Sequence, residues 1–200
     1  ERVRVLAFDV NNAGAWEAAT ATLTSEWEGI DHLIYCAAAY RPVRAWELTP
    51  ALIQEMVGTN LAAAMTGVAS VLPALLARGE GAVSLVGSVA GYRGLPHSLA
   101  YGPTKAALIN LSETLYLDLH RRGVGVSLIN PGFVDTPLTR TNDFAMPALL
   151  TPAQAAEAIL KGWARGAFEI HFPRRFTWGM KLLRILPYRL FFAATRRLNA

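Results

Sequence analysis

Short apolar segments alternate with helix-like segments along most of this 200-residue chain, and this alternation limits the fold more than any other feature. Helices cover both faces of a parallel sheet, so the strands of such a sheet are apolar almost throughout. The apolar segments here have that character. The sequence therefore predicts an α/β fold with a doubly wound parallel sheet in three α/β/α layers. Its strands are expected at residues 2–8, 32–35, 82–86, 124–129 and 168–172.

Helix starts are marked by two Thr-Pro pairs, at Thr49 and Thr151, each of which places a capping side chain before a proline at the first helical position. Apolar residues at helical spacing extend the pattern from there. Helices are predicted at residues 13–27, 50–78, 99–121 and 152–165, followed by a helical tail from residue 178. No linker interrupts the pattern. One domain is therefore predicted at residues 1–177, with a C-terminal extension at residues 178–200.

Composition excludes two classes of protein. The hydrophobic share is 52% and the charged share is 17%, so an intrinsically disordered chain is excluded. The net charge of +4 is modest and is concentrated near the C-terminus, which argues against a nucleic-acid-binding surface over the body of the domain.

Cys36 is the single cysteine, so the chain can form no internal disulfide, and a reducing compartment such as the cytoplasm is expected. We expect Cys36 to be a small buried hydrophobe rather than a nucleophile, because no histidine stands near it in the sequence. The histidines show no metal-ligand spacing, and no metal is predicted. They are His32, His97, His120 and His171.

Tyr101 and Lys105 are four positions apart in a predicted helix, where such positions are neighbours on one face. A free tyrosine has a pKa of about 10, and a nearby ammonium lowers that pKa. A tyrosine adjusted in this way can exchange a proton with an alcohol oxygen, which the Ser88 hydroxyl could orient. By itself the pair also fits a tyrosine packed on a lysine stem. Its interpretation therefore depends on companion motifs.

Companion motifs occur along the chain, in the order in which a known family carries them. The chain resembles the classical short-chain dehydrogenase/reductase family from residue 2 to about residue 172. Asp9-Val10 is similar to the acidic position after the family's third strand, and residues 31–38 (DHLIYCAA) resemble its Asp-x-Leu-Val-Asn-Asn-Ala-Gly segment. Residues 131–136 (PGFVDT) resemble its Pro-Gly segment. The family's catalytic tetrad is matched by Asn60, Ser88, Tyr101 and Lys105.

The resemblance implies a Rossmann-type fold and hydride transfer between NAD or NADP and a carbonyl or secondary alcohol. It implies that Tyr101 is the acid/base and that Ser88 bonds the substrate oxygen. Lys105 would lower the Tyr101 pKa and bind the nicotinamide ribose, and Asn60 would hold a water that links Lys105 to solvent. A non-catalytic regulatory or interaction protein on the same scaffold is the alternative.

The resemblance also implies a set of cofactor contacts. Asp9 and Val10 would meet the adenine ring, while Thr136 and the backbone of Val134 would fix the carboxamide. The whole implied set is Asp9, Val10, Cys36, Ala37, Ala38, Tyr101, Lys105, Pro131, Gly132, Val134 and Thr136.

Two departures from the family pattern stand out. Cys36 replaces an asparagine that ties neighbouring strands together, although a thiol is a weak hydrogen bonder, and Ala38 replaces a glycine. The family's glycine-rich phosphate turn is absent. We therefore expect the family's first strand, first helix and second strand to lie outside this sequence. In the family's strand order, 3-2-1-4-5-6-7, the strands at residues 2–8 and 32–35 would then each lack a neighbour.

Substrate contacts are expected from two places, and ordinary loop packing is the alternative for both. Residues 138–150 lie where the family keeps a substrate loop, and Phe144 and Met146 would cover a small, apolar substrate there. The segment between Ser88 and Tyr101 would add Tyr92, Arg93 and His97.

The C-terminal tail carries basic residues and no acid between positions 181 and 197. Bulky apolar residues separate these cations, which predicts a peripheral contact with acidic membranes into which Phe191 and Phe192 insert shallowly. Packing on the tail's own domain or on the mate in a homodimer or homotetramer is the alternative. The cations are Lys181, Arg184, Arg189, Arg196 and Arg197.

Overall fold

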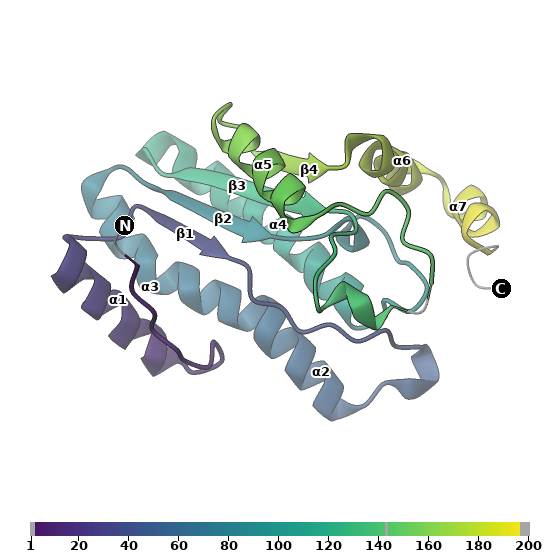
Figure 1. Ribbon diagram of the computed structural model, residues 1–200, viewed down its shortest axis with the longest axis horizontal. Helices are drawn as coiled ribbons and strands as arrows, with labels where there is room; N and C mark the ends of the chain where they lie inside the picture. The colour runs from purple at the N-terminus through teal and green to yellow at the C-terminus, as the bar shows by residue number, and fades with distance from the viewer. Residues whose placement is uncertain (1–2, 143, 197–200) are drawn as a thin grey trace.

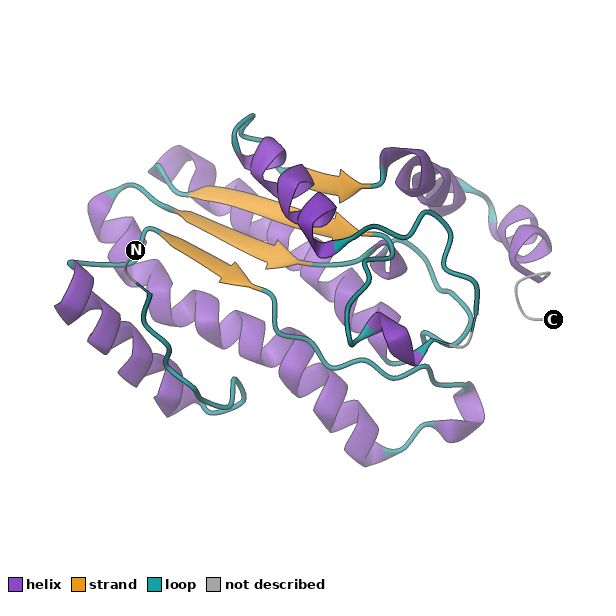
Figure 2. Ribbon diagram, viewed as in Figure 1, coloured by secondary structure: helices purple, strands orange, loops and turns teal. Residues whose placement is uncertain are grey.

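The computed structural model describes residues 3–142 and 144–196 and contains one four-stranded parallel sheet (Figures 1 and 2). Its strands lie side by side in chain order, which is the order that the resemblance implied for the last four strands. The pairing aligns His32 with Ala82, Ala82 with Gly125, and Leu128 with Glu169. The strands are β1 (His32–Tyr35), β2 (Ala82–Val86), β3 (Gly125–Pro131) and β4 (Glu169–Phe172). The predicted α/β class and parallel sheet are therefore confirmed.

Helices cover both faces of this sheet, as predicted. Helices α3 and α4 lie on one face and α5 lies on the other, while α1 packs beside α3 (Figure 1). Side-chain alternation along β2 explains the two layers, because Val83 and Leu85 are buried on the α3 and α4 side. Ser84 between them accepts a hydrogen bond from Trp163 of α5 at 3.1 Å. The helices are α1 (Ala13–Trp27), α2 (Pro50–Val57), α3 (Ala63–Arg78), α4 (Tyr101–Leu119), α5 (Pro152–Trp163), α6 (Arg174–Ile185) and α7 (Tyr188–Thr195).

Both predicted Thr-Pro starts are confirmed by their cap geometry. The Thr49 hydroxyl accepts a hydrogen bond from the backbone of Leu52, which begins α2. Thr151 and Gln154 form a reciprocal capping box at the start of α5. Each cap satisfies backbone N–H groups that a helix start leaves without an intrahelical partner.

The helix predicted at residues 50–78 is present but is not α-helical throughout. A π-helical segment, η2 (Gly58–Ala62), joins α2 to α3 and contains the buried residue Asn60. By length and composition, Pro50–Arg78 is the one described helix that could cross a membrane, with a mean hydropathy of 1.6. The same helix supplies Val68 and Val71 to the core, so its apolar composition also fits a core helix.

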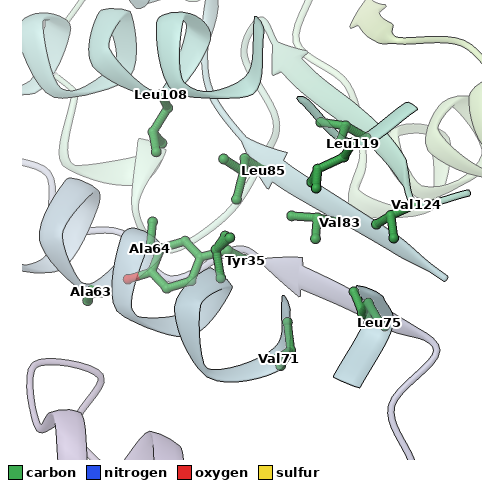
Figure 3. Packing of buried hydrophobic residues seen from close by; sticks show 12 residues of the cluster. Tyr35, Ala63, Ala64, Val71, Leu75, Val83, Leu85, Leu108, Leu119 and Val124 are labelled. Atoms are coloured by element: carbon green, nitrogen blue, oxygen red, sulfur yellow. The ribbon is translucent and has the colours of Figure 1, made fainter. Parts of the chain in front are cut away.

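The main core lies between the sheet and the two helices α3 and α4 (Figure 3). Its fully buried members come from β2, α3, α4 and the turn before β3, and each valine or leucine among them contributes about 1.5–3 kcal/mol by leaving water. This packing fixes the strand ends on which the site is built. The most deeply buried members are Ala64, Leu75, Val83, Leu85, Leu108 and Val124.

The strand predicted at residues 2–8 is wrong for its described part, residues 3–8, which is irregular; Arg2 lies outside the described residues. Val3 and Val5 are 79% and 81% exposed. Leu6 and Phe8 instead line a cavity of about 290 Å³ beside α1 and β1. A strand needs a neighbour to satisfy its backbone, and among residues 3–142 and 144–196 the order places β1 at an edge, with no strand between it and this segment. The expected elements outside the chain stay a prediction.

Candidate active site

The predicted catalytic residues gather beyond the carboxyl ends of β1 and β2, around the first turn of α4. Parallel strands all end at the same edge of the sheet, where α/β folds of this type bind ligands. Cys36 follows β1, Ser88 follows β2, and Tyr101 is the first residue of α4. Ser88 and Cys36 both lie close enough to Tyr101 to influence its pKa. The structure therefore brings together residues that are far apart in the sequence.

Tyr101 is partly buried, and burial raises the pKa of its phenol well above the ordinary value. A hydrogen bond with the Ser88 side chain acts in the opposite direction but does not cancel the effect of burial. Burial therefore outweighs the groups that lower this pKa in the described state, and the lowering expected from Lys105 stays a prediction. At neutral pH the phenol is protonated.

Lys105 is only 2% exposed, and its ammonium donates to the carbonyl oxygen of Val86 at 2.8 Å. The same nitrogen lies 5.4 Å from the centre of the Tyr101 ring. Burial lowers the pKa of Lys105 to about 8, because a dry environment disfavours the charged form. Lys105 thus lies beside the Tyr101 ring while its ammonium is hydrogen-bonded to the end of β2.

Ser88 begins a short 3₁₀ turn (Val89–Gly91), and its hydroxyl accepts a hydrogen bond from the Ala90 backbone at 3.1 Å. Gly91 allows this turn to pack directly on α4. A Cβ at position 91 would lie 2.6 Å from the carbonyl carbon of Lys105. Sequence reasoning missed Gly91, whose only signal was its place in the segment between Ser88 and Tyr101.

Asn60 is fully buried and clamps the chain that follows β1. Its side chain accepts from the Ala39 N–H at 2.7 Å and donates to the Ala39 carbonyl at 2.9 Å. A third bond, 3.1 Å long, reaches the hydroxyl of Thr104, the residue before Lys105. Asn60 therefore joins the π-helical segment to both the β1 end and α4, and π-helical segments are frequent at functional sites. Thr104 was also missed by sequence reasoning.

Cys36 is exposed, so the prediction of a small buried hydrophobe is wrong. Side chains alternate across a strand, and Tyr35, the last residue of β1, is buried in the core at 3% exposure. Its hydroxyl donates to the Thr59 carbonyl at 2.5 Å, and burial raises its pKa to about 12. Cys36 therefore faces the site, where it influences the pKa of both Tyr101 and Lys105.

The segment after β3 has a polar arrangement that fits a carboxamide. The Thr139 hydroxyl donates to the Val134 carbonyl at 2.5 Å and accepts from the Thr136 N–H at 3.1 Å. It also lies 3.3 Å from the Thr136 hydroxyl. A carboxamide carries both donors and an acceptor, so it could exchange with the Thr139 hydroxyl at these groups. Thr139 was not identified from the sequence.

The other predicted cofactor residues lie near this edge with contacts of their own. Gly132 donates its N–H to the Phe172 carbonyl at 2.7 Å, directly after Pro131 at the end of β3. Ala37 and Ala38 are half-buried directly after Cys36, and their contact with the cofactor stays a prediction. Asp9 is exposed and accepts from the backbone of Asn11 at 2.9 Å, while Val10 packs against the core. The adenine contact of Asp9 and Val10 stays a prediction.

The predicted substrate loop is closed at its base by backbone pairing between Val134 and Leu150. Asp143 within it lies outside the described residues. The Phe144 ring meets Phe133 edge to face at 5.9 Å. Met146 contacts Asn142, with 3.4 Å between the Asn142 Nδ2 and the Met146 Sδ.

Tyr40 connects this loop to the site and was missed because it belongs to no motif. Its hydroxyl donates to Asn142 Oδ1 at 2.7 Å. Its ring meets the Tyr101 ring edge to face, with the centres 4.9 Å apart.

Two of the three substrate residues predicted between Ser88 and Tyr101 have other contacts. Tyr92 is buried, and its hydroxyl donates to Glu169 at 2.5 Å. Arg93 donates to the carbonyls of Arg184 and Leu186 at 2.5 and 3.1 Å. Tyr92 and Arg93 therefore join the body of the fold to its C-terminal part. That these two residues and His97 line a substrate pocket stays a prediction.

The partners of Tyr92 form a polar cluster between β4 and α6. Burial of the Glu169 carboxyl raises its pKa, but hydrogen bonds from Lys181, Tyr92 and Asn130 outweigh burial and leave the pKa below its ordinary value. Lys181, predicted to meet a membrane, is therefore already paired with Glu169 at 2.5 Å.

The C-terminal helices are partly packed on the fold. Thr177 and Met180 of α6 and Phe191 of α7 are buried, and the Arg93 guanidinium lies 4.4 Å from the centre of the Phe191 ring. The prediction that Phe191 inserts into a membrane is therefore wrong. Arg197 lies outside the described residues. Helix α6 begins at Arg174 and runs through the boundary predicted between residues 177 and 178. The division of the chain into a domain and a C-terminal extension stays a prediction.

No group of three histidine, cysteine, aspartate or glutamate side chains is arranged to hold a metal ion within residues 3–142 and 144–196. Two of the histidines have polar partners instead. His32 lies 2.8 Å from the Ser84 hydroxyl, and His171 lies 2.6 Å from the Thr177 hydroxyl.

Comparison with known proteins agrees with this geometry. The chain is 36% identical over 197 residues to a Myxococcus xanthus protein named as an uncharacterised oxidoreductase, with 98% of this chain and 78% of the relative covered. A short-chain dehydrogenase from Streptomyces avermitilis superposes with a TM-score of 0.83 at 19% identity, covering 97% of this chain and 79% of that one.

A gluconate 5-dehydrogenase from Burkholderia cenocepacia, solved with NADP and tartrate, superposes with a TM-score of 0.65 at 26% identity. The match covers 69% of this chain and 55% of that one. The sequence profile of the short chain dehydrogenases matches residues 1–145. The chain therefore belongs to the short chain dehydrogenase family of NAD(P)-dependent oxidoreductases.

Proposed function

We propose that the protein reduces a carbonyl group to a secondary alcohol, or runs the reverse reaction, with Tyr101 as the acid/base. The observation that carries the proposal is the contact group of Tyr101, Ser88 and Lys105 at the end of β2. The three side chains offer a proton donor, a second hydroxyl for the same substrate oxygen and a cation. This is the set that hydride transfer to a carbonyl requires.

Burial favours the protonated form of the Tyr101 phenol, which suits the role of proton donor. In the reduction, the phenol gives its proton to the carbonyl oxygen as charge develops there. Ser88 donates a hydrogen bond to the same oxygen and orients it. Lys105 stabilises the phenolate that Tyr101 leaves behind, and Asn60 holds both the β1 end and the α4 residue next to Lys105 in place.

NAD or NADP supplies or accepts the hydride when it is bound. We assign the nicotinamide ribose to Lys105 and Tyr101 and the carboxamide to Val134 and Thr136. Asp9 and Val10 would meet the adenine ring. The remaining members of the site would flank the cofactor with small side chains and backbone: Cys36, Ala37, Ala38, Pro131 and Gly132.

The test uses the full-length protein with NADH and NADPH and a panel of carbonyl compounds of graded size, aliphatic and aromatic. We expect oxidation of one or both cofactors with at least one small apolar ketone or aldehyde. Tyr101→Phe should remove that activity and leave cofactor binding intact. Cofactor binding without turnover on any carbonyl or alcohol would favour the alternative, a non-catalytic regulatory or interaction protein.

We also propose that the protein works in the cytoplasm and that α6 meets the surface of an acidic membrane. Trp178, Leu182 and Ile185 follow one another at helical spacing and are 62%, 59% and 75% exposed. The opposite side of α6 packs on the fold through Met180. An apolar stripe that the fold leaves uncovered is typical of an interaction surface.

Charge favours a membrane over a second copy of the chain as the partner of this stripe. The sequence from residue 173 to residue 196 contains six basic residues and no acid, and of the six Lys181 is already paired with Glu169. A two-fold interface places the same patch of both copies face to face, which would bring these cations together. An acidic bilayer instead attracts them at about 1 kcal/mol for each cation near its surface. A homodimer or homotetramer formed through other surfaces is compatible with this proposal.

A further inference from the structure

Tyr40 occupies a position between the catalytic tyrosine and the substrate loop. It follows β1 by five residues and is half-buried. Two different parts of its side chain make two different contacts: the ring meets the Tyr101 ring, and the hydroxyl donates to Asn142. Substitution can therefore separate the two contacts.

The loop at residues 138–142 and 144–150 is anchored at its base and on one side independently of Tyr40. Its base is paired through Asp135, whose N–H donates to the Leu150 carbonyl at 2.9 Å, and through the Leu150 N–H, which donates to the Phe133 carbonyl at 3.0 Å. Phe144 packs on Phe133. Away from this base, Asn142 bonds to the hydroxyl of Tyr40, whose ring in turn meets the Tyr101 ring.

We propose that Tyr40 is a positioning residue that holds the substrate loop closed over Tyr101 through its hydrogen bond to Asn142. The inference rests on the proposed role of Tyr101 for its consequence in catalysis. The hydrogen bond itself does not depend on that role. When the bond breaks, the base and the Phe144 contact keep the loop attached to the fold, while Asn142 is released from Tyr40.

The hydrogen bond between Tyr40 and Asn142 should change the ratio of closed to open loop by a modest factor. A neutral hydrogen bond contributes an amount that corresponds to about a threefold to tenfold change in an equilibrium. Losing it should therefore lower the ratio of closed to open loop by that factor, and so raise the open fraction of a mostly closed loop by about the same factor, without unfolding the loop. A substrate that is covered by the closed loop would bind more weakly, whereas Tyr101 would still deliver its proton.

Because the Tyr40 ring and hydroxyl make separate contacts, removing the hydroxyl alone should change one kinetic parameter and not the other. Tyr40→Phe keeps the ring on Tyr101 and removes only the hydroxyl. We expect KM for the best carbonyl substrate to rise about threefold to tenfold while kcat stays within about twofold. If Tyr40 only supported the Tyr101 ring, kcat would be the parameter sensitive to substitution, and Tyr40→Phe would leave KM unchanged.

Trypsin cleavage after Arg140 measures the loop directly, without any activity. Arg140 lies within the loop two residues before Asn142, and its side chain is 68% exposed. In the full-length protein, Tyr40→Phe should accelerate this cleavage about threefold to tenfold under native conditions. Cleavage after Arg165, in the exposed turn after α5, gives an internal reference that should not change. Tyr188→Phe is the matched control, because Tyr188 is exposed and lies on α7.

A double-mutant cycle decides whether the bond to Asn142 is responsible. Tyr40→Phe and Asn142→Ala should each accelerate cleavage after Arg140, and the double variant should be no faster than the faster single variant. Unchanged cleavage in Tyr40→Phe relative to Tyr188→Phe would overturn the proposal, as would full additivity of the two substitutions. If the proposed reaction fails instead, no variant will turn over a carbonyl, and the cleavage rates still decide the role of Tyr40.

Discussion

Lys105 donates its ammonium to the carbonyl oxygen of Val86 at 2.8 Å and at the same time lies 5.4 Å from the centre of the Tyr101 ring. The cation is thus fixed by the end of β2, and the phenol is protonated in the described state. Lys105 is charged enough at neutral pH to stabilise a phenolate once a proton has left. This arrangement predicts an effect of Lys105 on the pH dependence of stability and an effect of Tyr101 on turnover.

The thermodynamic signature of Lys105 is a pH dependence of stability. Burial lowers its pKa from 10.5 to about 8, so between these values the unfolded chain binds a proton that the folded chain does not. Stability therefore rises with pH across this window. Relative to Lys105→Met, the wild-type unfolding free energy should increase by about 2 kcal/mol from pH 7.5 to pH 10.

Urea unfolding of the two proteins at both pH values measures this difference, in which the contributions of titrating groups remote from Lys105 cancel. A difference that is flat with pH would show that the Lys105 ammonium is not desolvated. A decrease with pH would mean that the folded state raises its pKa.

Gly91 should be essential to the site although it carries no functional group. A Cβ there would meet the backbone of Lys105 at 2.6 Å and push the Ser88 turn away from α4. Gly91→Ala should cost about 1–3 kcal/mol of stability and reduce turnover more than it reduces cofactor affinity. Gly94→Ala is the matched control, because its Cβ would meet nothing within 4 Å. Equal effects of the two substitutions in thermal unfolding and turnover assays would refute this account of the packing.

Some of this site is local enough to be predicted from the sequence, and some is not. The strands from His32 onward and the Thr-Pro helix starts follow from short-range patterns, and the structure confirms them. The strand predicted at residues 2–8 is not formed over residues 3–8, because strand formation depends on a neighbouring strand that a local pattern cannot supply. The π-helical segment around Asn60 carries no signal in composition or periodicity.

Other features depend on contacts between distant segments. Gly91, Thr139 and Tyr40 matter because of what packs against them, and no spacing in the sequence indicates those neighbours. Cys36 is different, because its exposure could have been predicted. Tyr35 ends a strand on the core side, and alternation then places the next side chain on the other face.

The exposed thiol of Cys36 offers a direct test of where the cofactor binds. Cys36 is the only cysteine among residues 1–200, and its alkylation by iodoacetamide is followed on the tryptic peptide that contains it. In the full-length protein, saturating NADH or NADPH should slow the alkylation at least about tenfold, because the bound nicotinamide half would cover the end of β1. Mass spectrometry follows the reaction, with Cys36→Ser as the unlabelled blank. An unchanged rate at saturating cofactor would place the cofactor elsewhere.

The membrane proposal can be tested on exposed residues whose substitution leaves the fold intact. A variant with Trp178, Leu182 and Ile185 all replaced by serine should lose co-sedimentation with phosphatidylglycerol vesicles at low salt. The wild type should bind these vesicles and not phosphatidylcholine vesicles. Replacing Leu117 and Leu160, which are 72% and 61% exposed elsewhere, by serine is the control. If the wild type stays in the supernatant with both kinds of vesicle, the stripe has another partner.

The role of Tyr101 as the acid/base is tested most directly by the turnover of Tyr101→Phe in the full-length protein. The substitution keeps the ring against Tyr40 and Lys105 and removes only the hydroxyl that exchanges the proton. We expect cofactor oxidation at saturating carbonyl to fall about 10²- to 10⁴-fold, the usual contribution of a positioned acid. The dissociation constant for NADH or NADPH should change less than about threefold, because Lys105 still meets the ribose and Val134 and Thr136 still meet the carboxamide in the proposed arrangement. Turnover within about tenfold of wild type would contradict the assignment of Tyr101 as the acid/base.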